Sequence, residues 1–359
     1  MLIIFILIEL ISSISTSGLT KNYFYNKRIM EEGADPKVES GDSALEVSEP
    51  EVTERVKRPQ EIIIKVSKNG EQELLWKKFG DYSNNVLFSF YDENDNILES
   101  DRFKVKVNTT KTIKIKLDDI LFSCKNMFAN LTNIIEIDLS NFDNSEVTDM
   151  TRIFEGCKNL IKLDFGENFN TSSVLTMENL FANCTKLASI DVSKFDISKV
   201  ENMDCLFDNC HTLTFLGLSN FNTSSVTRMC FIFNRCKNLK SIDLSSFDTS
   251  KVTHFEFFFQ NCEQLTSLDV SKFITSLGEN FQKMFYGLKL LTSLDESNFD
   301  TSNALDFNYM FKDLRIIKVL DLRSFNTSIV EDFGDIFSEC RQLTSLDISS
   351  FDTSPKQLN

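Results

Sequence analysis

The stretch LKSIDLSSFDTSKVT, residues 239–253, recurs along this chain with a period of 26 residues. Its phenylalanine belongs to a series spaced by 26 residues, with one interval of 27: Phe142, Phe169, Phe195, Phe221, Phe247, Phe273, Phe299, Phe325 and Phe351. A second series begins at Phe128 and continues, as the predicted structural core ladder, through Phe154, Phe181, Phe207, Phe233, Phe259, Phe285, Phe311 and Phe337. Nine copies without a break make chance implausible and indicate a stacked repeat array.

The repeat explains an unusual composition. The chain has 359 residues and contains 34 Phe against one Trp and six Tyr, and the two series account for 18 of the 34. Its formal net charge is −15. An acidic surface of this size argues against nucleic acid or an anionic membrane as the partner, because both repel it.

Two periodicities within one repeat predict its local structure. Val147, Met150, Phe154 and Cys157 follow the i, i+3, i+7, i+10 spacing of one face of a short helix. Residues 160–165 then supply a short strand. The sequence therefore predicts the α/β class: a leucine-rich-repeat-type solenoid of about nine 26-residue coils, each with a short parallel strand and a short helix, preceded by a small N-terminal β cap domain.

The chain divides into five predicted parts. An apolar run followed by small residues predicts a signal peptide over residues 1–18, with no transmembrane span after its cleavage. A segment rich in Glu, Asp, Ser and Pro predicts a disordered acidic linker over 19–60. A small β domain over 61–120 is expected to cap the solenoid at 121–354, and 355–359 form a polar tail.

Alternating apolar residues predict the strands of the β domain. They lie at residues 62–66, 86–91, 103–107 and 112–117, and the last two read as a hairpin. The lysines between the apolar residues of those two strands are expected on a solvated sheet face, with a basic patch as the alternative.

The phrase LTSLDVSKF, residues 265–273, and its copies resemble the repeats of BspA-like leucine-rich-repeat surface proteins, whose units also occur in surface lipoproteins of unknown function. The shared pattern is LxxLDLSxFDTSxVTxMxxMFxxC, and it covers about residues 118–354. The resemblance implies the solenoid fold and a secreted or cell-surface setting. Adhesion to host or matrix proteins, known for some members, is implied more weakly. The family supplies no catalytic motif.

Six of the nine cysteines share one slot, three residues after the second-series phenylalanine: Cys157, Cys184, Cys210, Cys236, Cys262 and Cys340. Other coils place Leu in this slot, so we predict free buried thiols, with disulfides between adjacent coils as the alternative. Cys205 and Cys230 lie off this ladder, on the predicted helices, and are better candidates for pairing or reactivity.

An aspartate ladder on the predicted strand is the candidate ligand-binding feature: Asp138, Asp164, Asp191, Asp243, Asp269, Asp295, Asp321 and Asp347, with Gly217 as its gap. Stacked like charges repel, so either calcium between coils or a recognition stripe would explain them. The alternative is that these carboxylates hold turns through backbone hydrogen bonds. A second ladder of Asp and Asn, five residues later, favours that structural reading.

These patterns predict an extracellular binding or adhesion module, not an enzyme. No Cys/His cluster or Gly-rich phosphate loop occurs, so no catalytic residue, metal ligand or cofactor is predicted, apart from the calcium alternative. The expected partner is a protein ligand, such as a host or matrix protein. The alternative function is a structural surface coat or matrix protein that assembles side by side, with calcium as a linker.

Overall fold

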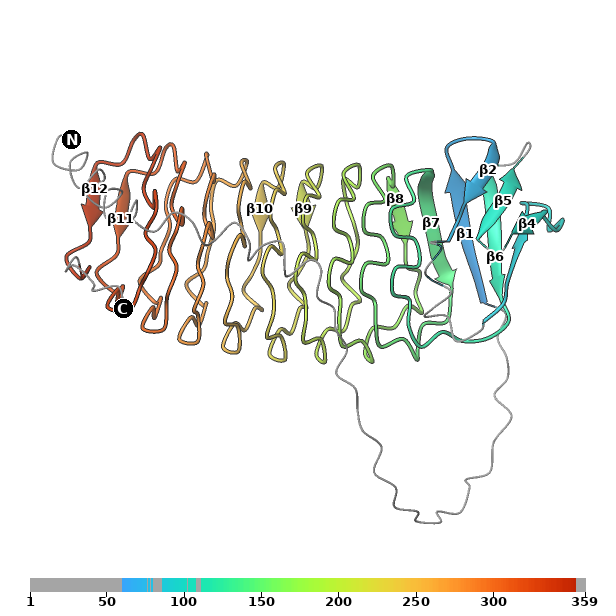
Figure 1. Cartoon of the computed structure of the whole chain (residues 1–359), viewed down its shortest axis with the longest axis horizontal. Coiled ribbons are helices and arrows are strands. Elements are labelled where there is room, and N and C mark those ends of the chain that lie inside the picture. The colour runs from blue at the N-terminus through green and yellow to red at the C-terminus, as the bar shows by residue number, and fades with distance from the viewer. Residues whose placement is uncertain are drawn as a thin grey trace, which may run out of the picture.

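A computed structural model describes residues 60–75, 77, 79, 86–101, 103–107 and 111–352. The predicted signal peptide, almost all of the predicted linker and the polar tail lie outside these residues. The described chain forms an elongated stack of coils with small β-sheets at its N-terminal end (Figure 1). Each coil advances the stack by one repeat.

The strands gather in four sheets. A five-stranded sheet has the order β3-β6-β1-β7-β8, a three-stranded sheet the order β2-β5-β4, and two pairs, β9 with β10 and β11 with β12, lie further along the stack. Their bounds are β1 Gln60–Val66, β2 Gly70–Glu73, β3 Phe88–Tyr91, β4 Ser100–Asp101, β5 Lys104–Val107, β6 Thr112–Leu117, β7 Ile134–Asn141, β8 Lys162–Asp164, β9 Phe215–Leu216, β10 Ser241–Ile242, β11 Val319–Asp321 and β12 Ser345–Asp347.

Strands β1, β3, β5 and β6 lie at the predicted positions, but the predicted hairpin is wrong. Strand β5 pairs with β2 and β4, whereas β6 pairs with β1 and β3. Both strands bury alternate residues, among them Val105 and Ile115, in one apolar core. Two sheets that share this core bury both apolar faces, which a single hairpin would leave half covered.

The N-terminal sheet continues directly into the coils. Strand β1 pairs antiparallel with β7, which belongs to the first coil, and β7 pairs in parallel with β8 of the next coil. The first coil therefore does not end in an open edge.

The lysines of β6 are not a free basic patch, because Lys114 and Lys116 both contact Asp95, at 3.0 and 3.1 Å.

The predicted strand-plus-helix coil is wrong, because no α-helix occurs among the described residues. Where the helix was expected, alternate backbone N–H groups donate to the next coil: Arg152 to Glu178 at 2.9 Å and Phe154 to Leu180 at 3.1 Å. Among the N–H groups between them, those of Glu155 and Cys157 close four-residue turns, to Arg152 at 3.3 Å and to Phe154 at 3.1 Å. The backbone is thus bonded between coils, not along a helix.

Residues with a left-handed backbone conformation (positive φ) produce this geometry. Each coil of the stack has two of them, two residues before and two after its second-series phenylalanine, such as Asn179 (φ 56°) and Asn183 (φ 62°). Asn and Gly adopt this conformation with little strain, and a right-handed helix cannot contain it. Short turns place an apolar side chain inward every three or four residues, and therefore imitate the helical spacing that the sequence shows.

The second-series phenylalanines form the centre of the stack. All nine are at most 1% exposed, and adjacent rings stack, as Phe154 and Phe181 do with centroids 5.7 Å apart and planes 2° apart. Nearly parallel rings at one repeat spacing show that the coils superimpose closely.

Candidate functional site

The aspartates of the strand ladder serve the backbone. Each accepts a hydrogen bond from the N–H two residues further on, as Asp243 does from Ser245 at 2.9 Å and Asp269 from Ser271 at 3.0 Å. The hydroxyl of Ser271 also donates to Asp269 at 2.6 Å. Hydrogen bonds from the Ser271 side chain and then its backbone hold the pKa of Asp269 below its usual range.

All eight ladder members make this bond. The donors to the remaining carboxylates are Ser140, Gly166, Ser193, Ser297, Arg323 and Ser349. The turn ladder does the same, for example from Ser250 to Asp248 at 2.9 Å. Within the described residues, no group of three or more His, Cys, Asp or Glu side chains is arranged to hold a metal ion. The ladder therefore has a structural use in each of the eight coils that carry it.

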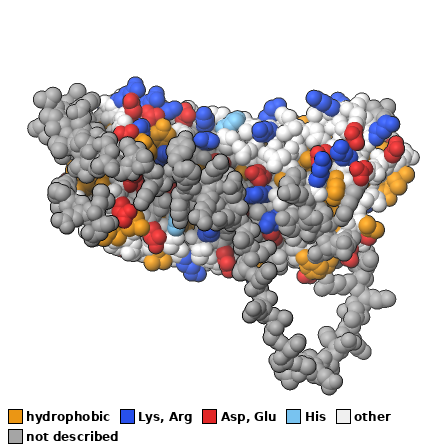
Figure 2. All heavy atoms as spheres, viewed as in Figure 1, with side chains coloured by type: hydrophobic (Ala, Val, Ile, Leu, Met, Phe, Trp, Pro, Cys, Tyr) orange, Lys and Arg blue, Asp and Glu red, His pale blue; other side chains and the backbone are white. Residues whose placement is uncertain are grey.

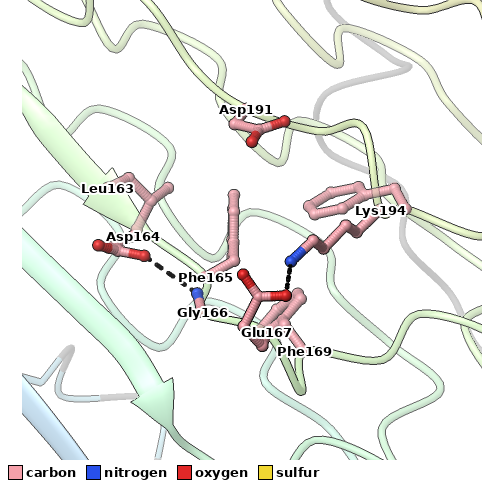
Figure 3. Close-up of a pocket in the computed structure, with 9 residues that line it drawn as sticks. Leu163, Asp164, Phe165, Gly166, Glu167, Phe169, Asp191 and Lys194 are labelled. Carbon is pink, nitrogen blue, oxygen red and sulfur yellow. Dashed lines mark hydrogen bonds and ion pairs between the residues drawn. The ribbon is translucent and has the colours of Figure 1, made fainter.

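A pocket opens in the ladder where the repeat has its one extra residue (Figure 3). It has a volume of about 130 Å³, with Asp164, Glu167, Asp191 and Lys194 among its lining residues and phenylalanines beneath them. Gly166 has φ 67°, and a Cβ there would lie 2.5 Å from Ser140 Cα, so the inserted turn requires glycine. Lys194 forms an ion pair with Glu167 across the pocket. Because Glu167 is largely exposed, this ion pair contributes little free energy.

The gap in the ladder is the second irregularity of the strand face. Gly217 stands where the other coils have Asp, and Phe215 stands where most coils have Ser. The Phe215 side chain is 62% exposed, and it pairs in parallel register with Ser241. The Cε1 atom of Phe215 lies 3.7 Å from the position that a Cβ on Gly217 would take. A phenyl ring thus lies on the open face beside a position that carries no side chain.

Sequence analysis noted Gly217 and missed Phe215. Comparing each coil with the others would have found it, because Ser189, Ser241, Ser267, Ser293 and Ser345 occupy the same position. The described part of the face seen in Figure 2 shows acidic, basic and hydrophobic side chains interspersed. Twelve large apolar residues are exposed among those described, and Phe215, at 62%, is the more exposed of the two phenylalanines in this group.

The prediction of free thiols is confirmed, because all nine cysteines are free, and the ladder cysteines are buried except Cys340, which is partly buried. In the ladder, each thiol donates to the carbonyl of the second-series phenylalanine one coil back, as Cys236 does to Phe207 at 3.2 Å. Burial raises the pKa of Cys157 to about 12. Cys205 and Cys230 do not lie on helices, and burial raises their pKa too, so neither thiol is activated.

Three comparisons bear on what the chain is similar to. The model of a family described as "Mycoplasma protein of unknown function, DUF285" matches residues 122–215, 206–319 and 280–357. These overlapping matches span nearly the whole stack. No curated protein matches the chain, and no solved structure does. The described residues include no helix long and apolar enough to cross a membrane.

Proposed function

The chain belongs to the DUF285 family, and we propose that it is a non-catalytic binding module that engages a protein ligand outside the cell through its strand face. The resemblance of its repeats to BspA-like surface proteins supports this setting. Repeat stacks provide long and regular surfaces for such contacts.

The exposed ring of Phe215 carries the proposal. Folding does not require it, since the other coils hold Ser, Glu, Lys or Val at the same position. Exposure of the ring leaves apolar surface in water that a partner could bury. Aromatic side chains are common among the residues that dominate binding energy at protein interfaces.

The surroundings of Phe215 suit an interface centre. The adjacent coils place Asp191 and Asp243 on either side of Gly217, and both are tied to their own turns. Their pKa values lie below the usual range because of hydrogen bonds from Ser193 and Ser245, so both stay ionised near neutral pH. An apolar anchor with a charged rim is the usual anatomy of a protein interface.

A consensus-restoring variant tests the proposal. The double change Phe215→Ser and Gly217→Asp gives this coil the residues that most others have. We expect unchanged thermal stability and loss of partner retention in a pull-down from cell-surface extracts. Val319→Ser is the matched control, because Val319 is 56% exposed in the same column of β11.

The outcomes separate the two functions. Equal retention by wild type and double variant would contradict a Phe215-centred interface. Self-association of the wild-type chain in sedimentation, with no partner retained, would favour the structural-coat alternative instead.

A further inference from the structure

A second surface departs from the repeat at the first left-handed position, two residues before the second-series phenylalanine. In four consecutive coils this position holds Phe231, Phe257, Lys283 and Tyr309, here termed the left-handed column, with φ of 58°, 59°, 55° and 60°. Bulky residues rarely adopt this conformation. The second left-handed position avoids the problem in most coils with Asn or Gly: Asn130, Gly156, Asn183, Asn209, Asn261 and Gly287.

The side chains of the column form one continuous stack. The rings of Phe231 and Phe257 lie 4.1 Å apart with planes 11° apart. The ammonium of Lys283 then lies 4.8 Å from the centre of the Phe257 ring and 5.2 Å from that of Tyr309. A lysine is thus framed by two aromatic rings from the adjacent coils, a geometry that attracts a cation.

Positive charge gathers at this point of a chain whose net charge is −15. The ammonium of Lys312 lies 4.7 Å from the centre of the Tyr309 ring and pairs with Asp335 at 2.8 Å. Among the described residues, no carboxylate is within ion-pair distance of Lys283. Its ammonium has aromatic neighbours and only a more distant acid.

The charge balance agrees with this geometry. Burial lowers the pKa of Lys283 against the opposing charge of Asp306, and Lys312 and Arg235 lower it further. Burial also raises the pKa of Asp306 to about 6, which weakens it as a counter-charge. A further anion beside Lys283 would offset the repulsion that Lys312 and Arg235 exert on its ammonium.

We propose that Lys283, framed by Phe257 and Tyr309 and assisted by Lys312 and Arg235, is a binding site for a carboxylate of an acidic protein segment. The ammonium lies over the faces of both rings, so a carboxylate on an alkyl stem can pair with the ammonium while its stem packs against a ring. A sulfate group also carries negative charge, and the test below separates the two ligands. The site lies on a different column from Phe215, so it stands or falls independently of the proposed strand-face interface.

The test titrates the full chain with a hexaglutamate peptide and follows the lysine side chains by NMR. We expect binding that weakens with salt, together with a rise in the Lys283 pKa towards its ordinary value. Lys283→Met keeps the stem between the rings and should weaken binding about tenfold or more. Lys240→Met makes the same charge change on the strand face and should bind like the wild type.

Three results would overturn the proposal: absence of peptide binding, equal weakening by both variants, or a Lys283 pKa that does not move on saturation. A sulfated oligosaccharide that binds through Lys283 while the peptide does not would also overturn it, in favour of a glycan site. Unfolding of Lys283→Met would not hide the answer, because the pKa measurement uses the wild-type chain.

Discussion

Glu296 lies at a core position that the other coils fill with apolar residues: Leu139, Phe165, Val192, Leu218, Leu244, Val270, Leu322 and Ile348. It is 1% exposed; its Oε1 accepts a 3.3 Å hydrogen bond from the Asp321 N–H, and Oε2 has no partner among the described residues. Burial raises its pKa to about 7, and the charges of Asp295 and Asp321 act in the same direction. The folded state therefore holds a proton that the unfolded state releases.

Glu296 should make stability fall as pH rises. The contribution of Glu296 to the free energy of unfolding is fully present below its unfolded pKa, near 4.5. It is lost as pH rises through the folded pKa of about 7. Glu296→Leu should therefore stabilise the chain by about 2–3 kcal/mol at pH 8 and far less at pH 4. Denaturant unfolding of both proteins across this range measures the difference, with Glu296→Gln as the shape-matched control. A pH-independent difference would show that folding leaves the pKa of Glu296 at its unfolded value.

Thr249 joins two coils through a pair of buried hydrogen bonds. Its hydroxyl donates to the Ile274 carbonyl at 2.9 Å and accepts the Ile274 N–H at 2.8 Å, and the residue is 0% exposed. Thr249→Val leaves both backbone groups unpaired and should cost about 1–3 kcal/mol in chemical denaturation. Thr249→Ser keeps the hydroxyl and should cost clearly less. Equal losses in the two variants would assign the effect to packing.

At the scale of elements, the sequence predicted which side chains point inward but not how the backbone is bonded. Phenylalanine spacing placed the core correctly, because burial depends only on periodicity. The same spacing fits both a helix and a run of short turns, and Asn183 or Gly287 decides between them. In the FDTS phrase, residues 247–250, the sequence predicted the turn role of Asp248. It did not predict the buried hydrogen bonds of Thr249, because a polar side chain adds nothing to the apolar periodicity.

Strands show a similar limit. Parallel pairing was predicted for every coil, but the coils of Ile190, Leu268 and Leu294 carry no strand in the structure. The strands that form beyond β7 have only two or three residues each. Site features were harder still: Phe215 and Lys283 appear only when one coil is compared with its neighbours.

A glycine substitution separates turns from helices by the sign of its effect. Gly287 has φ 75°, and a Cβ there would lie 2.4 Å from Asn261 Oδ1. Gly287→Ala should therefore destabilise the chain by about 1–3 kcal/mol. In a helix the same change would stabilise by about 0.5–1 kcal/mol. A higher melting temperature for the variant would contradict the left-handed turn.

At the scale of the whole molecule, a coil in the middle of the stack has two neighbours and the last has one. Phe207 packs between Phe181 and Phe233, at 5.5 and 6.0 Å, whereas Phe351 is only half-buried and contacts Phe333 at 5.9 Å. Phe207→Ala should cost about 3–5 kcal/mol and Phe351→Ala much less, as measured by thermal melting. Equal losses would mean that the stack does not fray from its C-terminal end.

The central claim is that hydrogen bonds between coils replace the helices of a strand-plus-helix repeat. The column that contains Lys283 exists only if this claim holds, because its residues have positive φ and a right-handed helix cannot contain them. Far-UV circular dichroism of the purified chain tests it most directly. The account predicts a spectrum without the double minimum of α-helix, and a helical spectrum with a short helix in every coil would contradict it.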